Sequence, residues 1–166
     1  MNVILLGFRG SGKTAVGKKL ADQLWATFVD VDEMIAAQFA RPNAAADPLA
    51  AAAAAQVKIL SALSEDPQTI VAASSEFVPD GALVQSLKSH TRLVYLKAEP
   101  AVLASRIAPD SSGPRAFVPL LGRPQGADPA WLAQCDGAWS AMADLALDTS
   151  PMTIETVVRL VVRMAM

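Results

Sequence analysis

The chain has 166 residues, of which 52% are hydrophobic and 18% are charged, with a net charge of −2 and one cysteine. This length fits one domain with a single core, and this composition excludes a disordered chain. The lack of a basic block argues against nucleic acid as a partner, and a lone cysteine excludes an internal disulfide or a multi-cysteine metal site. No apolar run approaches the roughly 18 residues of a membrane helix, and no signal-peptide pattern opens the chain. We therefore expect a cytoplasmic protein whose ligand is a small molecule, and we favour a monomer.

Strand and helix patterns alternate along the chain. We expect strands at residues 2–6, 27–31, 69–73, 92–97 and 143–147, and helices at 13–25, 48–63, 81–89, 100–106, 129–142 and from 151 onward. Capping patterns mark two helix starts, because Asp47 and Ser150 each precede a proline, which fits the first helical position. This alternation predicts an α/β fold of three layers, with a mostly parallel five-stranded sheet and helices on both faces.

Residues 107–128 break the alternation, because prolines and glycines recur over about twenty residues. Loops of this length inside compact domains are usually functional lids or disordered inserts. We favour a lid at about residues 108–128.

The segment GFRGSGKT at residues 7–14 fits GxxxxGK[ST] at every fixed position. Its glycines let backbone N–H groups surround a polyphosphate, because no Cβ atom stands in the way. The helix that begins after Gly12 adds its positive end, Lys13 reaches the β and γ phosphates, and the Thr14 hydroxyl can bind Mg²⁺. The segment follows a predicted strand and opens a predicted helix, so it predicts a phosphate-binding loop. The alternative is a glycine-rich turn without a ligand.

A dinucleotide-binding fingerprint is the rival interpretation of the same loop. Gly10, Gly12 and Ala15 fit GxGxxA, and acids follow at residues 30 and 32. Such a fingerprint has no use for GKT and leaves Gly7 without a role, so we favour the phosphate-binding loop.

Two acids follow the second strand in FVDVD. Residues two apart on a strand point to the same side, so we expect Asp30 and Asp32 to face the space beyond the carboxyl edge of the sheet. One would support a metal ion and the other would contact substrate. The alternative is that these acids are solvated and only cap the next helix, as Asp32 and Glu33 could.

These segments resemble the shikimate kinase family of small P-loop kinases. GFRGSGKTAVGKKLADQL followed by FVDVDEMI matches the family's opening, and IVAASSEFV, LVYLKAEPAVLASRI, PLLG and LALDT extend the likeness over nearly the whole chain. The resemblance implies one P-loop kinase domain over residues 1–166. It implies transfer of the ATP γ-phosphoryl group to the 3-hydroxyl of shikimate, with ATP and Mg²⁺ as cofactors.

The resemblance also implies residue roles. Asp32 would bind the attacking hydroxyl and take its proton, and Asp30 would support the metal ion through water, together with the Thr14 hydroxyl. Arg106 would lie against adenine, and Arg115 would be the lid arginine, although it is displaced from the family's position beside PLL. The implied catalytic residues are Lys13, Asp32 and Arg115, and the implied cofactor-binding residues are Gly10, Ser11, Gly12, Lys13, Thr14, Ala15 and Arg106.

The chain departs from the family where the acceptor would bind. AAAAAQVK replaces a segment with an arginine for the shikimate carboxylate, leaving Gln56 or Lys58 nearest, and a second expected arginine falls near Cys135. The family's triple glycine after the third strand is SSE at residues 74–76. Two lost charge-assisted hydrogen bonds, each worth roughly 1.5–3 kcal/mol, weaken binding by roughly two to four powers of ten. We expect weak or absent turnover of shikimate, or another hydroxylated acceptor.

Two other functions stay open. One is a nucleotide-binding module that has lost phosphotransfer, and the other is an NTP hydrolase switch, for which the sequence offers no identifiable water-orienting residue. Away from the site, we expect Cys135 to be a small buried apolar residue and His90 to be solvated. We expect the tryptophans to pack in the core or the lid, at Trp25, Trp131 and Trp139.

Overall fold

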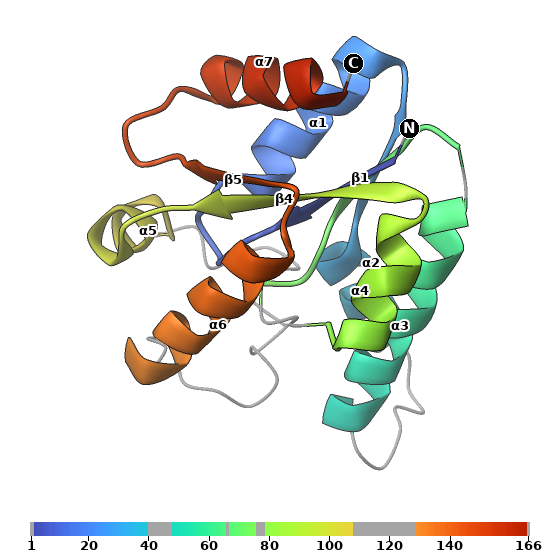
Figure 1. Cartoon of the computed structure of the whole chain (residues 1–166). Helices are drawn as coiled ribbons and strands as arrows, with labels where there is room; N and C mark the ends of the chain where they lie inside the picture. Colours follow the sequence, from blue (N-terminus) through green and yellow to red (C-terminus); the bar gives the residue numbers. More distant parts are fainter. Residues whose placement is uncertain (1, 40–47, 66, 76–78, 108–128, 166) are drawn as a thin grey trace.

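The structure is a computed structural model that describes residues 2–39, 48–65, 67–75, 79–107 and 129–165. Within these ranges, parallel strands form one sheet in the order β2-β3-β1-β4-β5 (Figure 1). The strands are β1 (Asn2–Leu6), β2 (Thr27–Asp30), β3 (Thr69–Ala72), β4 (Thr91–Lys97) and β5 (Leu145–Asp148). The helices are α1 (Lys13–Leu24), α2 (Val31–Phe39), α3 (Pro48–Glu65), α4 (Gly81–Lys88), α5 (Pro100–Ile107), α6 (Pro129–Met142) and α7 (Ile154–Ala165). The predicted α/β architecture is confirmed.

Alternate residues of each strand supply two cores, one on each face of the sheet. Val3 and Leu5 of β1 pack with buried residues of α1 and α7, such as Val16 and Val161. Ile4 and Leu6 face the opposite way, toward buried residues of α2, α3, α4 and α6. Figure 1 shows α1 and α7 together above the sheet and α3, α4 and α6 below it. Because both faces are covered, the strands read as apolar runs in the sequence.

Helix α2 was not among the helices predicted from periodicity, and its start corrects the predicted end of the second strand. The Asp30 carboxylate accepts hydrogen bonds from the backbone N–H groups of Asp32 (3.1 Å) and Glu33 (3.4 Å). This side chain therefore caps the helix, which begins at Val31, directly after the strand.

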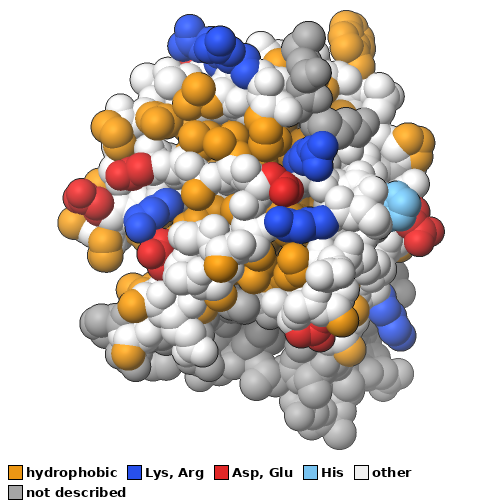
Figure 2. All heavy atoms as spheres, viewed as in Figure 1, with side chains coloured by type: hydrophobic (Ala, Val, Ile, Leu, Met, Phe, Trp, Pro, Cys, Tyr) orange, Lys and Arg blue, Asp and Glu red, His pale blue; other side chains and the backbone are white. Residues whose placement is uncertain are grey.

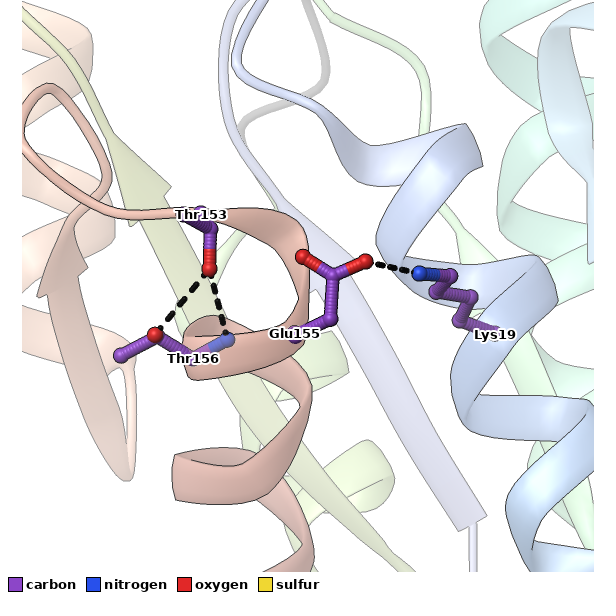
Figure 3. Close-up of polar contacts among 4 residues, drawn as sticks. All are labelled: Lys19, Thr153, Glu155 and Thr156. Carbon is purple, nitrogen blue, oxygen red and sulfur yellow. Dashed lines mark hydrogen bonds and ion pairs between the residues drawn. The ribbon is translucent and has the colours of Figure 1, made fainter.

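The start of α7 also differs from the prediction that Ser150 and Pro151 open the last helix. The Ser150 hydroxyl accepts a hydrogen bond from the Glu99 backbone N–H (2.9 Å), so it is used away from the helix. At the observed start, the Thr153 hydroxyl accepts from the Thr156 N–H at 3.3 Å (Figure 3). Figure 3 also shows the ion pair between Lys19 of α1 and Glu155 of α7, which joins the two helices of one layer.

Three predictions on single residues have clear outcomes. Cys135 is 1% exposed and Trp139 is fully buried, and His90 is exposed, as expected. Trp25 is 91% exposed at the left-handed residue that ends α1, so its predicted packing is wrong. The Trp131 side chain and the predicted lid at 108–128 lie outside the described residues.

The described surface has no strong charge bias on the face shown in Figure 2, where positive and negative side chains are interspersed. Among the described helices, none is long and apolar enough to cross a membrane.

Candidate functional site

The loop between β1 and α1 has a backbone that favours glycine at three positions. Gly7, Gly10 and Gly12 have φ values of 146°, 85° and 95°. A Cβ atom on Gly7 would lie 2.5 Å from the Leu96 carbonyl oxygen and 2.6 Å from the Ser11 hydroxyl oxygen. No side chain fits at such distances, so the first glycine is required by close packing as well as by conformation.

Lys13, at the start of α1, folds back into this loop. Its Nζ donates hydrogen bonds to the carbonyl oxygens of Gly7 (2.7 Å) and Phe8 (3.1 Å) and to the Ser75 hydroxyl (3.0 Å). The lysine is 7% exposed, and Ser75 is also buried. A buried cation therefore joins the loop after β1 to the chain that follows β3.

Thr14 connects the loop to the end of β2. Its hydroxyl donates to the Asp30 carboxylate at 2.8 Å, and Asp30 is 8% exposed. Asp32 lies in the first turn of α2, where it is half-buried. The prediction that Asp30 and Asp32 share one side of a strand is wrong in its geometry, because the strand ends at Asp30. Asp32 still follows the carboxyl end of β2 by two residues.

The opposite side of the loop is connected to α5 and to the segment after β5. The Arg106 guanidinium donates to the Thr149 carbonyl (2.9 Å), the Thr149 hydroxyl (3.2 Å) and the Gly10 carbonyl (3.5 Å). The Thr149 hydroxyl in turn donates to the Lys97 carbonyl at 3.0 Å. These contacts fix the glycine loop against the carboxyl ends of β4 and β5.

An aromatic contact supports the loop from below. The ring centroids of Phe8 and Trp139 lie 4.6 Å apart in an edge-to-face arrangement, and Trp139 also contacts Tyr95. The Tyr95 hydroxyl donates to Asp136 at 2.8 Å, and Lys97 pairs with the same carboxylate at 3.1 Å. Burial, followed by the hydrogen bond to Asp136, raises the pKa of Tyr95 well above its usual range, so the phenol stays protonated.

The loop fits a phosphate group in three respects. The glycines open its backbone, a buried cation lies within it, and the buried Ser11 hydroxyl has no hydrogen-bond partner. An unpaired buried polar group is costly, so a ligand that contacts it is favoured. Over the described ranges, no cluster of three or more His, Cys, Asp or Glu side chains could hold a metal ion. The Thr14 hydroxyl and the Asp30 carboxylate, which contact each other, are oxygen ligands of the kind that Mg²⁺ prefers.

Most of the residues singled out in the sequence lie together. The structure joins Gly10, Lys13, Thr14, Asp30 and Arg106 through the contacts given above, with Ser11, Gly12 and Ala15 in the same loop and first helical turn. Arg115 lies outside the described residues.

Sequence reasoning missed two contributors. Ser75 was noted only as a departure from the triple glycine, and Thr149 only as part of LALDT, although each binds a predicted site cation. The position of each at the end of a strand was the one available signal.

Comparisons with known proteins agree with this geometry. The shikimate kinase family model matches residues 9–164. The shikimate kinase of Moorella thermoacetica is 28% identical over 151 residues, covering 89% of this chain and 84% of that protein. The shikimate kinase of Chlorobaculum tepidum is 28% identical over 127 residues, covering 75% of this chain and 64% of that protein, just under two thirds of its length.

Solved structures share the fold. Shikimate kinase from Acinetobacter baumannii in complex with shikimate superposes with a TM-score of 0.75 at 18% identity, covering 99% of this chain and 92% of that one. Shikimate kinase from Bacteroides thetaiotaomicron gives a TM-score of 0.76 at 18% identity, covering 99% and 98%. The family model, the relatives and the arrangement of the loop after β1 together show that this chain belongs to the shikimate kinase family.

Proposed function

We propose that this protein is an ATP-dependent kinase that transfers the γ-phosphoryl group to a hydroxyl of a small metabolite. The observation that carries the proposal is the position of Lys13, buried in a loop of three positive-φ glycines and hydrogen-bonded to Ser75 at the end of β3. A cation in this position serves both the phosphate site and the adjoining acceptor site. The proposal treats residues 1–166 as one kinase domain, a monomer in the cytoplasm.

The phosphates would be held by the glycine loop and the first turn of α1. Backbone N–H groups, the Ser11 hydroxyl and the Lys13 ammonium are the donors there. Thr14 and Asp30 would hold Mg²⁺, and Arg106 would lie beside the base. When bound, ATP supplies the phosphoryl group, and the protein's contribution is mainly positioning and neutralisation of charge. The residues that we assign to ATP are Gly10, Ser11, Gly12, Lys13, Thr14, Ala15 and Arg106.

Asp32 is the proposed acceptor of the hydroxyl proton. It follows the end of β2 by two residues, is half-buried, and has a carboxylate oxygen that can accept a hydrogen bond from an alcohol. Arg115, in the predicted lid, would complete the catalytic set by neutralising phosphate charge.

The experiment is a screen of hydroxylated acids and sugars with ATP and Mg²⁺, with ADP release as the measurement. We expect one acceptor class to stimulate ADP release. Asp32→Asn should lower kcat by about a hundredfold to ten-thousandfold, since general base catalysis contributes roughly 10²–10⁴. Glu33→Gln, in the same first turn of α2 and exposed, is the matched control and should keep the wild-type rate.

The result that would overturn the kinase proposal is ATP binding without acceptor-dependent ADP release. That result would favour a nucleotide-binding module. ADP release that no acceptor changes would favour an NTP hydrolase.

A further inference from the structure

Gln56 of α3 is a buried polar residue with an unpaired acceptor. It is 2% exposed, and its Oε1 has no hydrogen-bond partner. Leu60, one turn later on the same side of α3, is fully buried in the core beneath the sheet. Gln56 therefore faces inward, and its Oε1 needs a donor that the folded chain does not supply.

The position of Gln56 along α3 places it at the carboxyl edge of the sheet. Asn2 marks the opposite edge, because its side chain contacts both the Leu63 carbonyl (3.5 Å) and the Thr69 N–H (3.1 Å). From Leu63 back to Gln56 is about 10 Å at 1.5 Å per residue. From Thr69 to Ala72 is also about 10 Å at roughly 3.3 Å per residue. Helix α3 runs antiparallel to the strands (Figure 1), so these two distances put Gln56 level with the end of β3.

Ser75 follows at the same edge and connects it to the phosphate loop. Its hydroxyl accepts the hydrogen bond from Lys13, and Ser74 beside it is also buried. Among the described residues, the polar side chains after β3 and on the inner face of α3 at this edge are thus two serine hydroxyls and one amide, all neutral.

The described basic side chains near this edge of the sheet either have partners of their own or lie away from Gln56. Lys13 lies in the phosphate loop, as does Arg9, and Lys97 is paired with Asp136. Lys58 is exposed, and it lies on a different side of α3 from Gln56 because the two residues are two positions apart in a helix. In contrast, the first turn of α2 carries the acid Asp32. Apart from Lys13, the described side chains on this wall of the site are therefore neutral or acidic, which disfavours an anionic acceptor.

We propose that the acceptor is a neutral polyhydroxylated compound, of the sugar or cyclitol class, and that Gln56 selects it by accepting a hydrogen bond from a hydroxyl that does not react. This inference rests on the proposed kinase function. Transfer joins the reacting hydroxyl oxygen to the γ-phosphorus and breaks the bond to the β–γ bridging oxygen. The hydroxyl proton passes to the Asp32 carboxylate, and ADP leaves.

The test compares neutral polyols (glucose, ribose and myo-inositol) with hydroxy acids (shikimate, quinate and gluconate) for ATP-dependent phosphorylation. We expect kcat/KM for at least one polyol to exceed that for every acid by about tenfold or more. Gln56→Met keeps the volume and removes the acceptor, so it should raise the KM for that polyol about tenfold and leave the KM for ATP unchanged. Its melting temperature should be equal or higher, because no buried oxygen is left unpaired. Gln23→Met, on the exposed face of α1, is the matched control.

Turnover restricted to hydroxy acids, turnover of none of the polyols, or an unchanged polyol KM in Gln56→Met would each overturn the inference. Calorimetry with ATP separates this failure from that of the kinase proposal. If ATP binds and only acids are phosphorylated, the kinase stands and the acceptor class is wrong. If ATP does not bind, the proposed function itself fails.

Discussion

Asp30 combines two structural roles that a double-mutant cycle can separate. Its carboxylate accepts a hydrogen bond from the Thr14 hydroxyl at 2.8 Å, and it caps α2 by accepting hydrogen bonds from the N–H groups of Asp32 and Glu33. The hydrogen bond to a charged acceptor contributes roughly 1.5–3 kcal/mol, and the cap contributes roughly 0.5–2 kcal/mol. Asp30→Ala should therefore lower the free energy of unfolding by about 2–5 kcal/mol.

The cycle uses Asp30→Ala, Thr14→Ala and the double variant, each unfolded in urea without ligand. Thr14→Ala removes the hydrogen bond to Asp30 and leaves the cap of α2 intact, so it should cost less than Asp30→Ala by about the value of the cap, roughly 1 kcal/mol. The coupling energy between the two residues should be about 1.5–3 kcal/mol. Asp22→Ala, an exposed acid on α1, is the matched control.

Two results would refute this reasoning. A coupling energy below about 0.5 kcal/mol would mean that the 2.8 Å contact contributes nothing to the folded state. Equal losses in Asp30→Ala and Thr14→Ala would mean that the carboxylate does not contribute as a cap of α2.

Three further predictions concern the loop and its support. Gly7→Ala should cost about 1–3 kcal/mol of stability, measured in urea, because the new Cβ meets oxygens 2.5 and 2.6 Å away; an unchanged midpoint would contradict this. Trp139→Ala should lower the free energy of unfolding by about 3–5 kcal/mol, and it should also weaken nucleotide binding, because Phe8 in the loop loses its ring contact. A loss of stability below about 1 kcal/mol would contradict this prediction. The hydrogen bond from Lys19 lowers the pKa of Glu155 in the folded protein. The ion pair therefore stabilises the fold fully at pH values above the ordinary pKa of 4.5, and this stabilisation is lost as pH falls through the lower pKa of the folded state. As pH is lowered, the urea midpoint of Glu155→Gln should therefore fall less steeply than that of the wild type. Parallel plots of midpoint against pH would contradict a stabilising ion pair between Lys19 and Glu155.

The sequence predicted the glycine-rich turn between β1 and α1 well, because the determinants of its conformation are local. The glycines, the lysine and the start of the following helix all lie within the eight residues 7–14. The parallel sheet was also predictable, since apolar runs alternate with helical patterns. Asp30 was identified through its position at the end of the second predicted strand, and capping of the next helix was considered only as the alternative to a role in the site.

Contacts between distant segments were not predictable. Lys13 meets Ser75 across 62 residues, and Arg106 meets Thr149 across 43, and no local pattern encodes either pairing. Ser150 was also mispredicted for this reason. It precedes a proline as a helix cap would, but its hydroxyl accepts a hydrogen bond from the distant Glu99 N–H and does not cap the helix. Local signals predict elements, whereas the packing of strand ends decides which side chains meet.

The central claim is that the loop after β1 binds the phosphates of ATP through Lys13, and calorimetry tests it most directly. ATP with Mg²⁺ should bind the wild-type protein with a measurable heat, and Lys18→Ala, an exposed lysine on the same helix, should bind equally well. Lys13→Ala should weaken binding by about tenfold to a hundredfold or more, because charge-assisted hydrogen bonds of roughly 1.5–3 kcal/mol are lost. An ATP affinity unchanged by Lys13→Ala would contradict the account.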